Sequence, residues 1–242
     1  MIGSPVWTAL ALAASSPPVV VAPRPSPAEL LDAWRWHNKF RADNAALRAS
    51  GRRPIIVFIG DSITEGWIVQ SPAFFTPDRI DRGISGETSA QMLTRFRADV
   101  IDLHPRLVQI MAGTNDIAGV LATISPEETR DNIRSMTELA QSHGIGVIIG
   151  SIPPADHFRW RPGVTPAPAI ADINRWMRAY AAACGATYAD YWQVLHNRQA
   201  MRATYTDDGV HPNRAGYEAF SPVADRAIRE ATIKLPAPKN RN

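Results

Sequence analysis

The stretch IIVFIGDS, residues 55–62, decides the fold of this chain. Its first five residues form an unbroken apolar run, which is typical of a central parallel strand that is covered on both faces. The run ends in Gly60-Asp61-Ser62, so a serine lies where the strand turns. If a helix begins there, the backbone N–H of Ser62 lies at the positive end of that helix and can face a developing anion. Gly-Asp-Ser is also ordinary turn chemistry, so the motif alone does not decide the function.

Further strand-like runs follow, with helical patterns between them. They lie at residues 79–84, 107–111, 145–149 and 187–189. Repeated βα units of this size predict an α/β fold, a three-layer, doubly wound sheet of about five parallel strands with right-handed crossovers. Ligands bind such sheets beyond the carboxyl ends of the strands, which is where Ser62 is expected to lie.

Capping and stop signals predict the helices between these strands. They place helices at residues 29–49, from Thr88 or Ser89 to about Val100, from the capping box at Ser125 to His143, and from about Pro168 to Cys184. A last helix follows Pro212, and we expect Pro222 to kink or split it because proline removes a backbone hydrogen bond.

The segment from Ile152 to Pro168 contains five prolines and shows no periodicity, which predicts a loop after the fourth strand. Such a loop at the ligand-bearing edge can carry substrate contacts, although proline-rich loops are also ordinary connectors. His157 and Trp160 from this loop, and Trp67 after the first strand, are candidate substrate-binding residues. Aromatic side chains there could narrow a pocket as easily as line it.

Length and composition indicate one globular domain. The chain has 242 residues, 45% of them hydrophobic, so it can bury a full core. We expect a folded domain at 29–234, a leader at 1–28 and a flexible tail at 235–242. The formal net charge is +3 and the basic residues are scattered among acidic ones, so a nucleic-acid surface is not indicated. Cys184 is the only cysteine, which excludes an intramolecular disulfide.

The leader contains an apolar run at residues 6–14 that is far too short to span a membrane. Ala11-Leu12-Ala13 resembles a signal-peptidase site. A typical signal peptide has a Lys or Arg before its apolar run, and this chain has none there. We expect export to the periplasm or the medium. The alternative is a disordered proline-rich leader on a cytoplasmic protein.

A second chemically informative segment, Asp208-Gly209-Val210-His211, lies near the C-terminus. An Asp and a His three residues apart can share one loop, so the carboxylate can hold the imidazole while the imidazole faces a serine from another strand. This spacing predicts hydrolase geometry with Ser62. Asp207 is one residue off the spacing and is the weaker candidate.

Two further strand ends carry hydrogen-bond donors that we expect to lie near Ser62 at the same edge of the sheet. Asn115 follows the run at 107–111 and offers a side-chain amide, and Gly86 follows the run at 79–84 and offers a backbone N–H. Each also has an ordinary explanation: Thr-Asn-Asp often forms an Asx turn or helix cap, and the Gly86 segment can be a plain βα turn.

Four blocks therefore occur in order: Gly60-Asp61-Ser62, the Gly86 turn, Gly113-Thr114-Asn115-Asp116, and Asp208-Gly209-Val210-His211-Pro212. In residue type, order and placement they resemble the SGNH or GDSL family of serine hydrolases over about residues 55–233. Ile63 replaces the leucine that gives the family one of its names. The phrases at 60–67, 82–88 and 111–115 look most like the branch related to platelet-activating-factor acetylhydrolase subunits and bacterial acetyl esterases.

The resemblance implies a flavodoxin-like SGNH hydrolase fold and a role for each matched residue. Ser62 would be the nucleophile, His211 the general base and Asp208 the carboxylate that orients it. The backbone N–H groups of Ser62 and Gly86 and the amide of Asn115 would form the oxyanion hole. No metal or other cofactor is needed, and the other histidines lack the paired spacing of a zinc site. A homodimer would suit this branch.

These residues predict a serine esterase that acts on short acyl groups, acetyl above all, of a small-molecule or carbohydrate ester. The same triad could serve a thioesterase or a lysophospholipase. A domain of this fold could also bind glycans or a protein without turnover, since a fold does not fix a function.

Overall fold

The computed structural model describes residues 26–28, 38–120 and 124–235. The predicted leader, except its last three residues, therefore lies outside the described residues, as do residues 29–37 of the first predicted helix and residues 236–242 of the predicted tail. Leu235, the first residue of that tail, packs against buried side chains. No helix among the described residues is long and apolar enough to cross a membrane.

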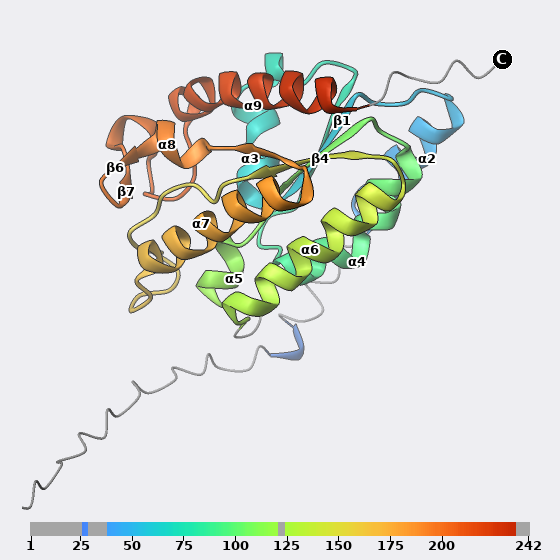
Figure 1. The fold of residues 1–242 in the computed structure, drawn as a ribbon. Helices are drawn as coiled ribbons and strands as arrows, with labels where there is room; N and C mark the ends of the chain where they lie inside the picture. Colours follow the sequence, from blue (N-terminus) through green and yellow to red (C-terminus); the bar gives the residue numbers. More distant parts are fainter. Residues whose placement is uncertain (1–25, 29–37, 121–123, 236–242) are drawn as a thin grey trace, which may run out of the picture.

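The centre of the molecule is a five-stranded parallel sheet, as predicted (Figure 1). Its strands are β1 (Ile56–Gly60), β2 (Arg79–Gly83), β3 (Leu107–Met111), β4 (Gly146–Gly150) and β5 (Thr187–Ala189). They are arranged in the order β2-β1-β3-β4-β5. This is the flavodoxin-like order, in which the direction of winding reverses beside β1. Gly60 at the end of β1 is level with Gly83 and Met111, so the carboxyl ends of three strands meet at one edge.

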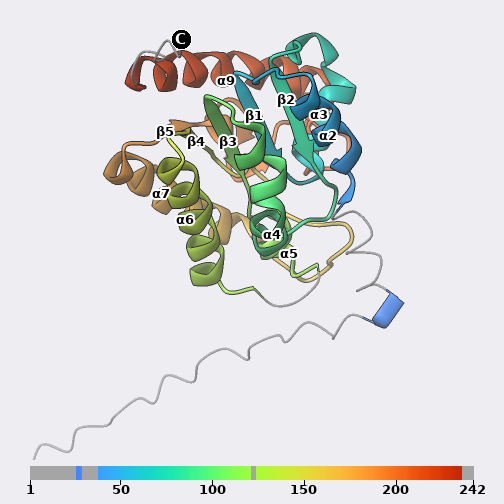
Figure 2. The ribbon, with the colours of Figure 1, turned by 90° about the vertical axis from the view of Figure 1, so that its right-hand side faces the viewer.

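Helices cover both faces of the sheet, which gives three layers (Figures 1 and 2). One face is covered by α4 (Ser89–Asp99), α6 (Pro126–Ser142) and α7 (Pro166–Cys184), and the other by α3 (Ser62–Gln70), α8 (Tyr191–Leu195) and α9 (Arg214–Lys234). The alternation along β1 explains this arrangement: Val57 and Ile59 join the core under α4, α6 and α7, whereas Ile56 and Phe58 join the core under α3 and α9.

Smaller elements complete the fold. They are the helices α2 (Arg41–Ala49) and α5 (Thr114–Ala118), the 3-10 turns η2 (Pro72–Phe74), η3 (Ile101–Leu103) and η4 (Ala203–Tyr205), and the antiparallel pair β6 (His196–Asn197) and β7 (Ala200–Met201). This pair could not be predicted from the sequence, because strands of two residues are too short to show a period. The helix α2 corresponds to the second half of the helix predicted at 29–49.

The predicted caps are present at two helices. Ser125 forms the predicted capping box with Glu128 at the start of α6, and Thr88 forms one with Gln91 at α4. The helix α7 begins at Pro166, close to the predicted start, and residues 151–165 before it form a loop without regular structure.

The expectation that Pro222 would split the last helix is wrong, since α9 runs unbroken from Arg214 to Lys234. A proline leaves the carbonyl four residues earlier without its helical partner, here that of Glu218. Pro222 and Glu218 are both exposed, so water can hydrogen-bond to that carbonyl. The buried face of α9 continues on either side through Phe220 and Val223.

Candidate active site

The turn between β1 and α3 places Ser62 at the first position of α3, at the carboxyl edge of the sheet. Asp61 caps this helix by accepting a hydrogen bond from the Ile63 N–H at 2.9 Å. Gly60 is required before it, because an added Cβ would lie 2.0 Å from the Thr64 hydroxyl. Burial raises the pKa of Asp61 from 3.8 to about 6, against the opposing hydrogen bond from Ile63.

Ser62, His211 and Asp208 form a continuous hydrogen-bonded chain. The Ser62 Oγ lies 2.8 Å from the His211 Nε2, and the His211 Nδ1 lies 2.6 Å from the Asp208 Oδ2. The histidine and aspartate side chains are 37% and 31% exposed, so the site is open at the surface of the molecule. An imidazole held this way carries its proton on Nδ1 and can accept a proton from a serine hydroxyl on Nε2.

The loop that carries this pair is fixed by its own backbone. The Asp208 Oδ1 accepts hydrogen bonds from the N–H groups of Val210 at 2.9 Å and His211 at 2.8 Å. Gly209, between Asp208 and Val210, has φ +87°, a conformation that other residues rarely adopt. Burial alone would raise the pKa of Asp208, but the hydrogen bonds from His211 and Val210 outweigh it and lower the pKa to about 2. Asp208 is therefore ionised at neutral pH.

Asp207, the neighbouring carboxylate, points elsewhere. It is exposed, and its Oδ1 accepts a hydrogen bond of 3.4 Å from the Asn213 amide. The carboxylate that holds His211 in this structure is that of Asp208.

The Gly86 turn and Asn115 meet beside the nucleophile turn. The Asn115 Nδ2 donates a hydrogen bond of 2.9 Å to the Glu87 carbonyl and carries a second N–H. Gly86 has φ +80°, which requires a glycine, and its neighbours are tied down because the Ser85 N–H binds Glu65 and the Glu87 N–H binds Ile84. The structure therefore brings together two strand ends that the sequence only suggested were close.

A buried carboxylate in the third block, Asp116, has a role that sequence reasoning missed. It accepts hydrogen bonds from the Ser89 N–H at 2.9 Å and from the hydroxyls of Ser89 and Thr129. Asp116 therefore fastens the segment after β3 to the start of α4. Burial raises its pKa against these hydrogen bonds.

Two of the three predicted substrate-binding residues lie beside the loop that carries Asp208 and His211, which we call the triad loop. Trp160 is 42% exposed, and its ring centroid lies 5.9 Å from that of His211. His157 packs over Gly209, where an added Cβ would lie 2.8 Å from the imidazole Cε1. Arg159 also donates to the Asp207 carbonyl at 3.2 Å, so the loop at 151–165 is docked on the triad loop.

The prediction for Trp67 is wrong, because its side chain is fully buried. Its ring stacks on that of Phe74, with 4.3 Å between the ring centroids, and contacts Phe220, and its indole N–H donates to Ser221. Trp67 lies five positions after Ser62 on α3, on the face that packs against the sheet and α9. It therefore packs α3 against the core and is not accessible to a ligand.

In the described part of the chain, no three His, Cys, Asp or Glu side chains are grouped so that they could hold a metal ion.

The fold and these groups define an ester hydrolase, and comparison with known proteins identifies its family. The model of the GDSL-like lipase/acylhydrolase family matches residues 58–219, and the chain belongs to this family. A crystal structure of a GDSL-like lipase from Bacteroides thetaiotaomicron is 41% identical, covers 81% of this chain and 98% of its own, and superposes with a TM-score of 0.75.

Two other similarities are more limited. An acetylxylan esterase from Geobacillus stearothermophilus shares the fold at 22% identity and a TM-score of 0.58, over 72% of this chain and 93% of its own. An uncharacterized lipoprotein of Bacillus subtilis is 36% identical over 76 residues, which is 30% of this chain. The match spans about a third of the length of that curated relative, 31%.

Proposed function

We propose that this protein is a serine esterase that hydrolyses short-chain acyl esters, acetyl esters above all, through an acyl-Ser62 intermediate. The observation that carries the proposal is the hydrogen-bonded chain from the Ser62 Oγ through His211 to Asp208. Membership of an acylhydrolase family supports the same reaction class.

In the first half of the reaction, the Ser62 Oγ attacks the ester carbonyl carbon while the His211 Nε2 takes the hydroxyl proton. The carbonyl oxygen becomes an oxyanion, which would accept hydrogen bonds from the N–H groups of Ser62 and Gly86 and from the second Asn115 N–H. The bond to the alcohol then breaks, and the alcohol leaves with the proton held by His211. Asp208, ionised at neutral pH, stabilises the imidazolium between these two transfers.

In the second half, a water molecule attacks the acyl carbon and gives a proton to His211. The bond between the acyl carbon and the Ser62 Oγ then breaks, the carboxylic acid leaves, and the proton returns to Ser62. No other reactant is required.

The position of Trp160 supports an alcohol with a ring, such as a sugar or an aryl group. Its exposed indole lies against His211, which protonates the leaving alcohol, so this side chain lies on the alcohol side of the scissile bond. A flat aromatic face packs well against the apolar face of a ring. Because an acetylxylan esterase shares the fold, acetylated carbohydrates are suitable substrates to test beside aryl esters.

The test is initial-rate hydrolysis of p-nitrophenyl esters from acetate to decanoate, with thioesters included, by the wild type and by folded Ser62→Ala. We expect activity that peaks at acetate or butyrate and disappears in the variant. A peak at long chains or on thioesters would replace the short-chain assignment. An inert wild type, or a Ser62→Ala variant of equal activity, would replace catalysis by a binding role.

We also propose export to the periplasm or the medium. The apolar run at residues 6–14 and the similarity to a Bacillus subtilis lipoprotein support this location. Cell fractionation of the full-length chain tests it, and recovery with the cytoplasmic fraction alone would contradict it.

A further inference from the structure

A buried arginine, Arg95 on α4, binds the segments that carry two of the candidate oxyanion donors, Ser62 and Gly86. Its side chain is only 1% exposed, and it is one of the largest fully buried side chains of the described residues. A cation this deep must have partners for its N–H groups, because an unpaired buried charge is strongly destabilising. Those partners show what Arg95 connects.

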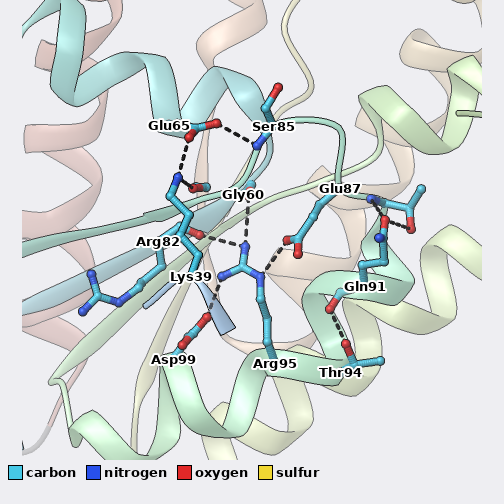
Figure 3. A network of polar contacts seen from close by, with 12 residues as sticks. Lys39, Gly60, Glu65, Arg82, Ser85, Glu87, Gln91, Thr94, Arg95 and Asp99 are labelled. Atoms are coloured by element: carbon cyan, nitrogen blue, oxygen red, sulfur yellow. Dashed lines mark hydrogen bonds and ion pairs between the residues drawn. The ribbon is translucent and has the colours of Figure 1, made fainter. Parts of the chain in front are cut away.

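The guanidinium binds two carboxylates and two backbone carbonyls (Figure 3). Its Nε donates to the Glu87 Oε2 at 2.6 Å and its Nη1 to the Asp99 Oδ2 at 2.9 Å. Its Nη2 donates to the carbonyls of Gly60 at 3.2 Å and Arg82 at 2.8 Å. A guanidinium is planar and rigid, so partners bound around it are held at fixed positions relative to one another.

Three of these four partners lie in the segments that carry the candidate donors Ser62 and Gly86. Gly60 ends β1 two residues before Ser62, and its carbonyl also accepts the Ile84 N–H at 3.0 Å. Glu87 directly follows Gly86, and its carbonyl accepts the Asn115 amide. Arg82 lies in β2 at the start of the Gly86 turn. Arg95 therefore binds the segments that carry the Ser62 and Gly86 donors directly, and it reaches the Asn115 donor through Glu87.

Stability alone is a weak reason for such a group. Replacing a buried ion pair by apolar side chains of similar volume is often neutral or stabilising, since burying the charges costs much of what their attraction provides. An oxyanion hole, by contrast, depends on donors held within about 0.5 Å of the productive geometry. A rigid guanidinium that binds the end of β1 and the Gly86 turn can hold these segments at a fixed spacing.

We propose that Arg95 is a positioning residue of the oxyanion hole. It acts through Glu87 and through the Gly60 carbonyl, and it sets the spacing between the N–H groups of Ser62 and Gly86 and the Asn115 amide. Asp99, its fourth partner, lies one turn further along α4 and binds the Asn44 amide, so none of its own hydrogen bonds within the described part of the chain is to a residue next to a candidate donor. The inference rests on the proposed esterase function, because it assigns Arg95 a part in that reaction.

The two carboxylates give a matched test, because each variant removes one of the two acids that bind Arg95. Glu87→Ala removes the partner beside the hole, and Asp99→Ala removes the partner remote from it. Both should lower the Tm. Only Glu87→Ala should lower kcat for p-nitrophenyl acetate, by about 10-fold with KM within about two-fold, since a misplaced donor weakens transition-state binding and leaves substrate binding intact. Equal kcat losses, or a folded Glu87→Ala with wild-type kcat, would overturn the proposal.

Arg95→Lys provides a second measurement, because lysine keeps the charge but cannot bridge four partners. We expect it to lower kcat by at least as much as Glu87→Ala does. Combined with Asn115→Ala, it should cost less than the product of the two single losses, because the amide that Arg95 positions is already missing. Fully multiplicative losses would contradict positioning through this amide.

Wild type and Ser62→Ala, assayed alongside, separate the two proposals. An inert wild type would overturn the proposed function itself. An active wild type whose kcat is unchanged in Glu87→Ala would overturn the role of Arg95 alone.

Discussion

The side-chain amide of Asn115 has two N–H groups with different roles. One of its amide N–H groups binds the Glu87 carbonyl, and in the proposed mechanism the other binds the oxyanion. Asn115→Ala should therefore lower kcat by about 10² to 10³, the loss typical of removing one oxyanion donor. KM should change little. Steady-state kinetics on p-nitrophenyl acetate checks this, and unchanged turnover in a folded variant would exclude Asn115 from the oxyanion hole.

The adjacent aspartates allow a sharper test of the triad. Asp208→Asn should lower kcat by about 10³ to 10⁴, because an amide no longer stabilises the imidazolium or selects its tautomer. Asp207→Asn should have little effect on kcat, since that carboxylate is exposed and its hydrogen bond is with Asn213. Measuring both folded variants with one substrate is sufficient, and the reverse result would assign the triad to Asp207.

Asp61 should make stability depend on pH, because burial raises its pKa to about 6 from an ordinary value of 3.8. A raised pKa means that the folded state binds the proton more tightly than the unfolded state. The resulting stabilisation is complete below pH 3.8 and is lost as the pH rises through 6. By the pKa difference, the loss amounts to at most about 3 kcal/mol.

Asp61→Asn removes this titration and keeps a residue that caps helices well. Relative to the wild type, the variant should gain unfolding free energy as the pH is raised from about 4 to about 7. Urea denaturation of both proteins across this range measures the difference. A difference that does not change with pH would show that Asp61 does not titrate in this way.

Among the elements, the strands and the main helices could be predicted because their signals are local. The run at 55–59 is apolar throughout, and Ser125 and Glu128 form a capping box that short-range chemistry alone determines. Pro222 shows the limit of local reasoning, because the surroundings of α9 tolerate a proline on its exposed side. Trp67 shows the same limit, since nothing local distinguishes an aromatic residue beside a pocket from one beneath it.

The loop at 151–165 is an element whose position no periodicity predicts. Side chains hold it in place at two points. The Asn174 side chain accepts a hydrogen bond from the Ile152 N–H at 2.8 Å and donates one to the Ile152 carbonyl at 2.9 Å. Further along the loop, Arg161 donates to the carbonyls of Ala118 and Gly119. This anchoring holds Trp160 against His211. A rigid loop of this kind favours a fixed wall of the site over a moving lid.

Trp160→Ala should therefore raise KM for esters whose alcohol contains a ring, by about 5- to 10-fold, the factor expected for losing one aromatic contact. Trp160→Phe keeps a flat ring and should lose less. Methyl acetate, whose alcohol is too small to reach the indole, serves as the control substrate and should be hydrolysed equally by all three proteins. A similar rise in KM for methyl acetate would place Trp160 on the acyl side.

At the scale of the whole molecule, the site depends on contacts between distant parts of the chain. The triad joins Ser62 to a loop about 150 residues later, and Tyr217 on α9 donates to the Ile63 carbonyl at 2.7 Å behind the nucleophile. The order of the four blocks predicted which residues meet. The burial of Arg95, Asp99 and Asp116 could not be predicted, because charged side chains in a helix indicate a solvated face unless tertiary structure buries them.

The two cores on opposite faces of one sheet should unfold as a single cooperative unit, since β1 contributes side chains to both. Ile133→Ala in the core under α6 and Phe220→Ala in the core under α9 each remove a fully buried side chain. Each should lower the unfolding free energy by about 2 to 5 kcal/mol. Because the sheet separates the two sites, their effects should add within about 0.5 kcal/mol in the double variant. Urea denaturation followed by fluorescence and by circular dichroism tests this, and two separate transitions would mean that the faces of the sheet fold independently.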